Sequence, residues 1–487
     1  MEERCEKRRP EEHDQLGKPY AHSHPFGPAD ARNRDHGGRE VEGTEEGRRR
    51  GHCDRPRERR VGVVDEEVQH RAGAQREQET QREGRPDDRD RLSEAPAGDH
   101  GASISRRPSR HRPARPRAML GAVRIETYAD VERAARRRLP KMVFDFVVGG
   151  AGAEVTLRAN RDAIERLRFD PRWLVDVSDR DTGTTVLGER VAMPVLLAPA
   201  GLAGLVHVQG ELAAIRAAGA AGTIACLSTA TSYAIEEMAA AASAPLWFQL
   251  YLGPSDRVTE DLVQRVKSAG YKALVLTVDT PVIGNRERDV RNGTRLPPEI
   301  RLGNTIDVLR HPRWLRCLLR DPKVRAANFP DGKLQAFDAT VTWEKVGWLR
   351  RLWDGPLVVK GVLSARDARE AVRQGADAVY VSNHGGRQLD SSPGTFDVLP
   401  EVVDAVGDRA EVLVDGGVRR GEDAVKARAL GARACLIGRP WFLALAAGGE
   451  AGVRTMLDVL RADVDRTLAL VGAKRVDDVT GAALRDG

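Results

Sequence analysis

Eight short apolar runs, each of a length suited to one buried β-strand, recur between residues 195 and 439 and constrain the fold most strongly. Helical segments separate them, and several of these segments end at Gly, as helices commonly do. Strands that alternate with helices predict a parallel sheet covered by helices. Eight such units favour an α/β fold of the (β/α)8 TIM barrel type over an open doubly wound sheet. The runs are Val195 to Ala200, Thr223 to Ser228, Leu246 to Tyr251, Ala273 to Asp279, Leu357 to Gly361, Ala378 to Asn383, Glu411 to Gly417 and Ala434 to Arg439.

The expected helices include four Ala-rich or amphipathic segments between the runs and two short segments before the first run. We expect the two early helices to close the end of the barrel opposite the active site. The four later segments are Glu211 to Ala221, Asp256 to Gly270, Ala365 to Gln374 and Glu422 to Leu430, and the two early ones are Tyr128 to Leu139 and Lys141 to Val148.

Residues 1–118 differ sharply in composition from the rest of the chain. They are rich in Arg, Glu, Asp, Gly and Pro, and no aromatic residue occurs between Phe26 and Tyr128. Such a segment buries too little apolar surface to offset its chain entropy. We therefore predict a disordered Arg-rich extension over 1–118 and a folded domain over 119–487, and Met119 is an alternative start of the chain.

The formal net charge of +6 comes partly from this extension. A basic arm can bind nucleic acid, but here acidic residues are interspersed and no aromatic stacking residue accompanies the arginines. We expect no nucleic-acid partner, and a scaffold that acts through the basic arm remains an alternative.

The cysteines and the hydropathy bear on location. Cys5, Cys53, Cys226, Cys317 and Cys435 show no spacing typical of a disulfide framework or a metal site, so we expect no metal. Prolines and glycines interrupt the longest apolar run, so we expect no membrane-spanning helix. These features predict a cytoplasmic protein, with peripheral membrane contact through the insertion described next as an option.

Roughly 80 residues separate the fourth apolar run from the fifth, much more than any other spacing in the series. We place an insertion at about residues 285–338. A long segment after a barrel strand lies at the catalytic face. The sequence leaves open whether it forms a lid over the active site or a surface loop.

Polar residues end nearly every apolar run, at the positions where TIM barrels carry their reactive groups. Lys360 closes a run of valines and is expensive to bury unless it meets an anion or an electron-rich ring. The last two runs end in Asp415-Gly416-Gly417-Val418-Arg419 and Gly438-Arg439. Glycines let backbone N–H groups approach a phosphate, and Arg supplies forked donors, so these two ends predict a phosphate site.

His384 follows the sixth run and precedes Gly385-Gly386-Arg387. This order places a base beside a guanidinium that can bind a carboxylate. Asp279, at the end of the fourth run, is a candidate to stabilise the imidazolium form of His384.

Taken together, these motifs resemble the FMN-dependent L-2-hydroxy acid oxidases and dehydrogenases, a family that includes glycolate oxidase, L-lactate dehydrogenase and mandelate dehydrogenase. The resemblance covers about Arg124 to Val479. It rests on motifs that occur in the family's order: Leu139-Pro140-Lys141, Phe248 to Tyr251, Thr277 to Pro281, Val359 to Gly361, Val381 to Arg387 followed by Gln388-Leu389-Asp390, Asp415 to Arg419, and Ile437 to Pro440.

The resemblance implies that FMN lies across the barrel mouth, with Lys360 stabilising the negative charge of the reduced flavin. The flavin ring would contact Pro199, Ala200, Gly201, Ser228, Gln249, Thr277 and Lys360, and the ribityl chain and phosphate would contact Ser382, Asp415, Gly417, Arg419, Gly438 and Arg439.

The resemblance also implies oxidation of an L-2-hydroxy acid to the 2-keto acid. Arg387 would bind the carboxylate, Tyr251 would hydrogen-bond near the reacting carbon, and His384 would take the hydroxyl proton with Asp279 behind it. Electrons would pass through FMN to oxygen, a quinone or a carrier protein, and the enzyme would be a homotetramer. Another FMN- or phosphate-binding barrel enzyme, such as an isomerase, is the alternative.

Two residues depart from the family pattern. Phe146 stands where the family usually has a substrate-binding Tyr, and Ala230 stands where glycolate oxidase has a Trp. The site should therefore have one donor fewer and more space. We expect a substrate larger than glycolate.

Overall fold

The computed structural model describes residues 119–120, 123–253, 255–294, 300–320, 324–329 and 337–486. The predicted extension over 1–118 lies outside the described residues.

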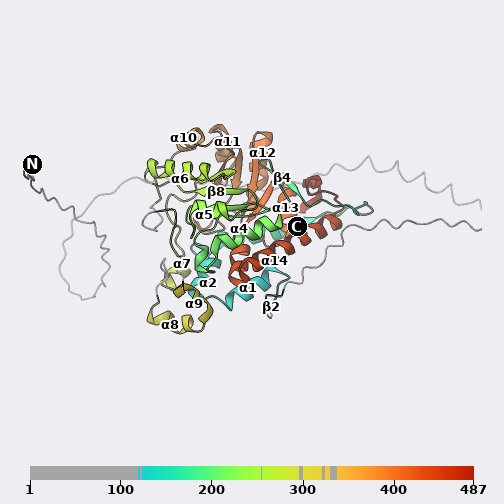
Figure 1. Cartoon of the computed structure of the whole chain (residues 1–487). Coiled ribbons are helices and arrows are strands. Elements are labelled where there is room, and N and C mark those ends of the chain that lie inside the picture. The colour runs from blue at the N-terminus through green and yellow to red at the C-terminus, as the bar shows by residue number, and fades with distance from the viewer. Residues whose placement is uncertain are drawn as a thin grey trace, which may run out of the picture. The chain divides into compact units, whose positions relative to one another are not determined.

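The centre of the fold is a closed barrel of parallel strands, which confirms the predicted TIM barrel (Figure 1). Each strand pairs in parallel with its neighbour in sequence, and β13 pairs with β6 to close the ring. The fifth barrel strand in the chain, β10, pairs directly with the fourth, β9, despite the long segment between them. The strands are β6 (Val195–Leu197), β7 (Ala225–Ser228), β8 (Leu246–Leu250), β9 (Ala273–Thr277), β10 (Leu357–Val362), β11 (Ala378–Val381), β12 (Glu411–Val414) and β13 (Ala434–Ile437).

Each barrel strand is buried on both faces, which explains why the runs read as continuous apolar stretches rather than alternating ones. One face packs under the helices as part of the main core. The other face fills the barrel interior, where a separate cluster includes Leu196, Trp247, Val275, Tyr380 and Leu413. The interior is thus a packed core rather than a pore.

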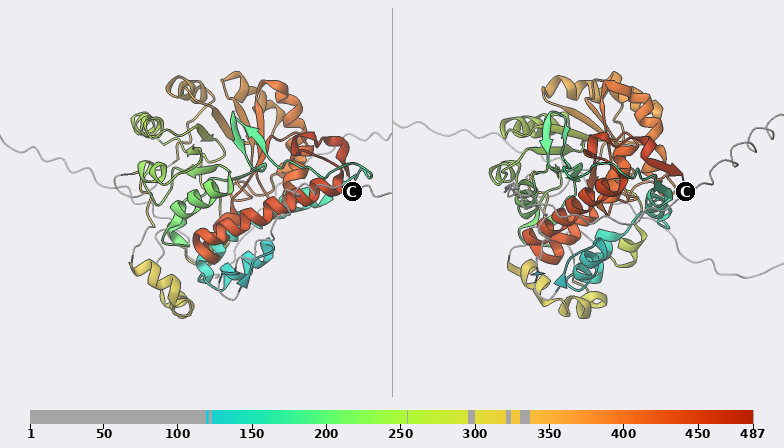
Figure 2. Two further views of the ribbon diagram at one scale, coloured as in Figure 1. Left: turned by 45° about the vertical axis from the view of Figure 1, so that its right-hand side comes forward. Right: turned by 90° about the vertical axis from the view of Figure 1, so that its right-hand side faces the viewer.

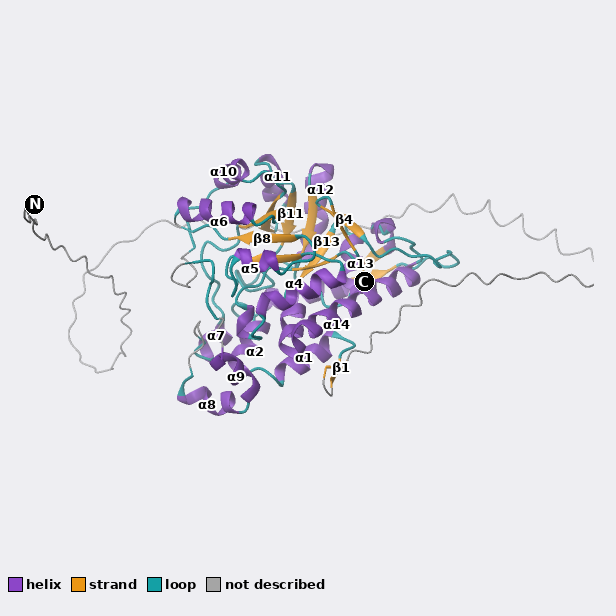
Figure 3. Ribbon diagram, viewed as in Figure 1, coloured by secondary structure: helices purple, strands orange, loops and turns teal. Residues whose placement is uncertain are grey.

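Helices surround the barrel, as Figure 2 and Figure 3 show. The four predicted interstrand helices are confirmed as α4 (Gly210–Ala221), α6 (Asp256–Ser268), α11 (Ala365–Arg373) and α13 (Gly421–Ala429). The helix α14 (Arg439–Val471) follows the last strand and is interrupted at Gly448 and Gly449, whose backbone angles are not helical. The ring also includes α5 (Ile235–Ala240), α10 (Glu344–Leu352) and α12 (Thr395–Val406).

The two early helices form as predicted, as α1 (Tyr128–Arg136) and α2 (Lys141–Val148). The prediction that they close the end of the barrel opposite the active site is wrong. Tyr128 and Phe146 line a cavity together with residues from the carboxyl ends of the strands. The hairpin of β4 (Thr184–Val186) and β5 (Glu189–Val191) packs against the barrel interior instead, through Val186 and Val191. Both helical segments are amphipathic, so their sequences predict that one face of each helix is buried. The sequences do not determine which end of the barrel the helices cover.

The segment between β9 and β10 contains helices in its described parts: α7 (Glu287–Arg291), α8 (Leu302–Leu309) and α9 (Pro312–Arg320). Trp314 on α9 is buried, and its indole N–H donates to the Leu205 carbonyl at 2.8 Å. This contact fastens α9 to the loop after β6. Within the described ranges, none of the helices combines the length and the apolar character needed to cross a bilayer.

Small elements complete the fold. They are α3 (Val155–Arg166), the pair β1 (Met119–Leu120) and β2 (Val123–Arg124), the pair β3 (Leu167–Phe169) and β14 (Leu484–Asp486), and the 3-10 turns η1 (Ala203–Leu205), η2 (Gly407–Arg409), η3 (Val476–Asp478) and η4 (Gly481–Ala483).

Candidate active site

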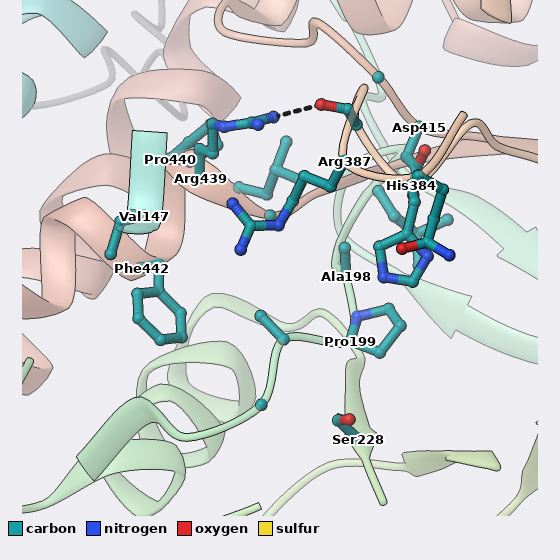
Figure 4. A pocket seen from close by; sticks show the side chains of 18 of the residues that line it. Val147, Ala198, Pro199, Ser228, His384, Arg387, Asp415, Arg439, Pro440 and Phe442 are labelled. Carbon is teal, nitrogen blue, oxygen red and sulfur yellow. Dashed lines mark hydrogen bonds between the residues drawn. The ribbon is translucent and has the colours of Figure 1, made fainter. Parts of the chain in front are cut away.

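A cavity of about 310 Å³ opens at the carboxyl ends of the barrel strands. This size is in the range of small-molecule and cofactor sites. In Figure 4, Arg387 and His384 project toward the same space, with Pro199 and Ser228 across from them. Fifteen of the residues singled out from the sequence line it: Phe146, Pro199, Ala200, Gly201, Ser228, Ala230, Tyr251, Lys360, His384, Arg387, Asp415, Gly417, Arg419, Gly438 and Arg439.

His384 lies between a carboxylate and a phenol. Its Nδ1 atom is 3.0 Å from Oδ1 of Asp279, and its Nε2 atom is 3.4 Å from the hydroxyl of Tyr251. An ionised carboxylate can only accept, so Nδ1 carries the hydrogen and Nε2 keeps its lone pair. The Tyr251 ring lies nearly parallel to the imidazole, with 6.5 Å between centroids, and Phe337 meets Tyr251 edge to face. The imidazole is therefore fixed with its basic nitrogen available.

Electrostatics keep this base neutral. Burial lowers the pKa of His384, and the nearby cations Lys360 and Arg286 lower it further, while Asp279 opposes them. Burial alone would raise the pKa of Asp279, but His384 and Lys360 outweigh it, so this pKa lies below its usual value. A neutral imidazole next to an ionised carboxylate suits a general base.

The turn that carries His384 has unusual backbone geometry. His384, Gly385 and Gly386 all have positive φ angles, at 58°, 64° and 75°. A non-glycine residue in this region is uncommon and marks either a turn or a functional constraint. Here the conformation turns the chain so that His384 and Arg387 face one cavity.

Among the described residues, three of the five arginines that line the cavity, Arg387, Arg286 and Arg439, interact electrostatically with one another. Burial lowers the pKa of Arg387 well below its usual value, and Arg286 and Arg439 lower it further. Arg387 donates to the backbone carbonyls of Phe146 and Gly149 at 2.8 and 3.0 Å. Buried like charges of this kind need anionic partners, so the cluster is suited to bind a carboxylate or phosphate.

The two departures from the family pattern both lie at the cavity. The Arg387 guanidinium lies 5.2 Å from the centre of the Phe146 ring, so this ring supports the guanidinium without offering a hydroxyl. Ala230 is buried in the loop after β7, and a Cβ on Gly201 would lie 2.8 Å from the Ala230 Cβ. The Ala230 side chain is thus closely packed against Gly201 at the cavity wall, and its small size places no bulky group there.

The predicted phosphate-binding turns also line the cavity. Gly417 has a φ of 82° and lies against the Asn160 backbone, where a Cβ would approach the carbonyl oxygen to 2.6 Å. The Arg419 guanidinium lies over the Tyr128 ring at 4.9 Å. Arg439 donates to the carbonyls of Val148, Gly149 and Gly385, so its guanidinium is firmly positioned and part of its donor capacity is used.

Four predicted residues do not line the cavity directly. Asp279 and Ser382 stand behind it, in contact with His384 and Lys360. The side-chain oxygen and nitrogen of Gln249 and the Thr277 hydroxyl are buried and have no hydrogen-bond partner among the described residues. Buried polar atoms normally have partners, so these atoms are suited to hydrogen-bond with a polar ligand.

Sequence reasoning missed several residues of the cavity. Arg286 lines it from the start of the predicted insertion, and Phe337 lines it from the end. Tyr128 and Arg161 come from α1 and α3. An Arg seven positions after Asp279 was a visible hint, because loops after barrel strands point into the active site. The lid role of the insertion stays a prediction.

Comparison with known proteins decides the family. Residues 135–486 match the family model described as FMN-dependent dehydrogenase. The chain belongs to this family. It is 44% identical over 360 residues to an L-lactate oxidase of Nostoc sp., covering 72% of this chain and 95% of that protein. It is 43% identical over 358 residues to glycolate oxidase 1 of Oryza sativa subsp. indica, covering 74% and 95%.

A solved structure agrees. The crystal structure of the monotopic membrane protein (S)-mandelate dehydrogenase superposes with a TM-score of 0.72 at 41% identity, covering 74% of this chain and 100% of that one. The chain is therefore an oxidoreductase of the FMN-dependent 2-hydroxy acid oxidases and dehydrogenases, with FMN as its cofactor.

The residues that line this cavity and those directly behind them fit FMN. The unpartnered polar atoms of Gln249 and Thr277 match the polar edge of a flavin ring. The glycines and Arg419 at the ends of β12 and β13 match a phosphate. The buried ammonium of Lys360 matches the electron-rich part of the ring.

Proposed function

We propose that this FMN-dependent dehydrogenase family member oxidises an L-2-hydroxy acid to the corresponding 2-keto acid. The observation that carries the proposal is the meeting of a neutral imidazole, His384, with a buried guanidinium, Arg387, in one cavity. A 2-hydroxy acid needs both groups, since its hydroxyl must lose a proton while its carboxylate is held in place.

In this proposal the ring of FMN is held by Pro199, Ala200, Gly201, Ser228, Gln249, Thr277 and Lys360, and the rest of the cofactor by Ser382, Asp415, Gly417, Arg419, Gly438 and Arg439. The buried, unpartnered atoms of Gln249 and Thr277 support the first set. The cluster of glycines and arginines at the cavity wall supports the second. When bound, FMN would supply an acceptor for the two electrons and the one hydrogen that leave the substrate carbon.

The protein side of the reaction follows from the same geometry. Arg387 and the neighbouring Arg286 bind the carboxylate, because their mutual repulsion is relieved by an anion. His384 accepts the hydroxyl proton at Nε2, and Asp279 stabilises the imidazolium that results. Tyr251 donates a hydrogen bond to the substrate next to Nε2 of His384.

The cavity favours a substrate larger than glycolate. Ala230 places only a methyl group at the cavity wall, and Phe337, Phe442, Ile283 and Leu202 add apolar surface to the lining. An apolar or aromatic side chain on the 2-hydroxy acid would bury against these residues.

The experiment is anaerobic reduction of the yellow, FMN-loaded protein by a panel of L-2-hydroxy acids of increasing side-chain size. We expect bleaching of the flavin absorbance, faster with larger apolar acids than with glycolate. Reoxidation of the bleached enzyme by oxygen, a soluble quinone or a carrier protein then identifies the electron acceptor. A correctly folded protein that binds FMN but is bleached by none of the acids would contradict the proposal.

We also infer peripheral membrane contact through α8. Leu302, Ile306 and Leu309 are 99%, 67% and 62% exposed, and their spacing places them on one helical face. Exposed arginines 301, 310 and 313 flank them. Exposed apolar residues flanked by arginines are typical of helices that lie on anionic membrane surfaces.

Co-sedimentation with vesicles of phosphatidylglycerol and phosphatidylcholine tests this inference. We expect binding to be lost when Leu302→Ser and Ile306→Ser are combined, and to be kept in Leu470→Ser, which changes another exposed leucine on α14. Equal binding by both variants would contradict a role of α8.

A further inference from the structure

Tyr380 lies in the barrel interior beneath the active site. It is on β11, is 0% exposed, and belongs to an interior cluster that is otherwise largely aliphatic. A buried phenol hydroxyl is costly unless it has a partner. Its partner is Asp415, since the Tyr380 hydroxyl donates to Oδ2 of that carboxylate at 2.9 Å.

A chain of hydrogen bonds begins at Tyr380 and reaches two sides of the active site. Ser382 Oγ donates to the other oxygen of Asp415 at 2.8 Å. The same Oγ accepts from Lys360 Nζ at 3.0 Å and from the backbone N–H of His384 at 3.1 Å. One hydroxyl thus connects the lysine predicted to face FMN with the turn that carries the base.

The carboxylate of Asp415 and the cofactor cavity both attract the Lys360 ammonium. The Lys360 ammonium is 4.0 Å from Oδ2 of Asp415, the oxygen that Tyr380 occupies, and 5.3 Å from the centre of the Tyr380 ring. At this separation the pair does not form a direct hydrogen bond. If Oδ2 lost its donor, Lys360 would be the nearest charged donor to replace it, because a buried carboxylate oxygen needs a partner.

We propose that Tyr380 is a positioning residue that keeps Asp415 from drawing the Lys360 ammonium away from FMN. The proposal rests on the assignment of Lys360 to FMN made above. By donating to Oδ2, Tyr380 leaves the positive charge of Lys360 directed toward the cavity. The charge then stabilises added negative charge on the cofactor.

The test is Tyr380→Phe in the FMN-loaded protein, with sulfite as the probe. Sulfite adds reversibly to oxidised flavins, and its affinity increases with positive charge beside the ring. We expect the sulfite dissociation constant to rise about tenfold, the effect of one buried hydrogen bond. The midpoint potential of the bound FMN should become more negative, and FMN should stay bound in stoichiometric amount.

Tyr271→Phe is the matched control. Tyr271 is also a buried tyrosine, and its hydroxyl donates to the Ile235 carbonyl at 3.0 Å, outside the chain of contacts described above. We expect its sulfite affinity and potential to equal those of the unmodified protein. The same change in both variants would reduce the effect to general loosening and overturn the proposal.

A double variant tests whether Tyr380 acts on Lys360 through Asp415. If Tyr380 acts through Asp415, Tyr380→Phe should have little effect on sulfite affinity in an Asp415→Asn background, although it has a clear effect alone. Equal effects in both backgrounds, an unchanged sulfite constant in the single variant, or loss of FMN from it would each overturn the proposal.

Lys360→Met separates this inference from the proposed function. If this variant binds sulfite as well as the unmodified protein does, the assignment of Lys360 to FMN fails. If Lys360→Met weakens sulfite binding and Tyr380→Phe does not, only the role of Tyr380 fails.

Discussion

Nδ1 of His384 lies 3.0 Å from Oδ1 of Asp279, although the two residues are 105 positions apart in the sequence. The contact joins the end of β9 to the turn after β11 across the mouth of the barrel. It fixes the ring tautomer and places a negative charge where the imidazole becomes positive on taking a proton.

The first prediction concerns that pair. Asp279→Asn should slow anaerobic flavin reduction about 10²- to 10⁴-fold, because the imidazolium loses its stabilising charge. His384→Ala should lose at least as much. Stopped-flow absorbance of the bound FMN measures both rates, and both variants should keep the cofactor. Near-normal reduction in His384→Ala would refute its role as the base.

The pH dependence follows from the lowered pKa of His384, which burial causes. Only the neutral imidazole accepts a proton, so the rate constant at low substrate should rise with pH through a value below 6.5, the usual pKa of His, and stay level near pH 7. Asp279 raises this pKa. In any residual activity of Asp279→Asn, the rise should therefore shift to lower pH. A rise centred above 6.5 would contradict the lowered pKa.

Phe146→Tyr should strengthen binding of the substrate carboxylate. The Phe146 ring already lies against the Arg387 guanidinium, so a hydroxyl on it would add one donor near the same anion. One hydrogen bond of about 1 kcal/mol corresponds to a roughly fivefold lower KM. Steady-state kinetics with the best acid of the panel measure it. An unchanged KM would mean that the hydroxyl does not reach the carboxylate.

Ala230→Trp should change the size preference of the enzyme. The Ala230 side chain lies against Gly201 at the cavity wall, so a larger side chain there would take up cavity space. We expect kcat/KM for the largest acid accepted to fall about 100-fold relative to glycolate, as for loss of about 3 kcal/mol of apolar contact. Equal losses for large and small acids would argue against a role in size selection.

Gly386→Ala should destabilise the fold and displace the turn that carries His384. The φ of Gly386 is 75°, and a Cβ there would lie 2.7 Å from the Leu157 backbone nitrogen. We expect a loss of about 3 kcal/mol in the free energy of unfolding, measured by urea denaturation. Gly270→Ala is the control, because its φ is 80° but a Cβ there would meet no atom within 4 Å. It should lose only about 1 kcal/mol.

The sequence by itself determined the barrel and the chemical types at its mouth. A strand buried on both faces must be apolar along its length, so all eight strands were visible as apolar runs, nearly all of which end in polar residues. His384, Arg387 and the glycines of the predicted phosphate-binding turns were visible for the same reason, since they follow those runs directly.

Tertiary structure decided what depends on the direction of a segment and on contacts between distant residues. The amphipathic pattern of α1 and α2 gave their helical state but not their position at the catalytic end. Arg286 reaches the cavity from a loop, whose course no periodicity reports. In the sequence, Tyr380 is one more residue of an apolar run that predicts a buried strand. Only the closed barrel brings its hydroxyl to the carboxylate of Asp415.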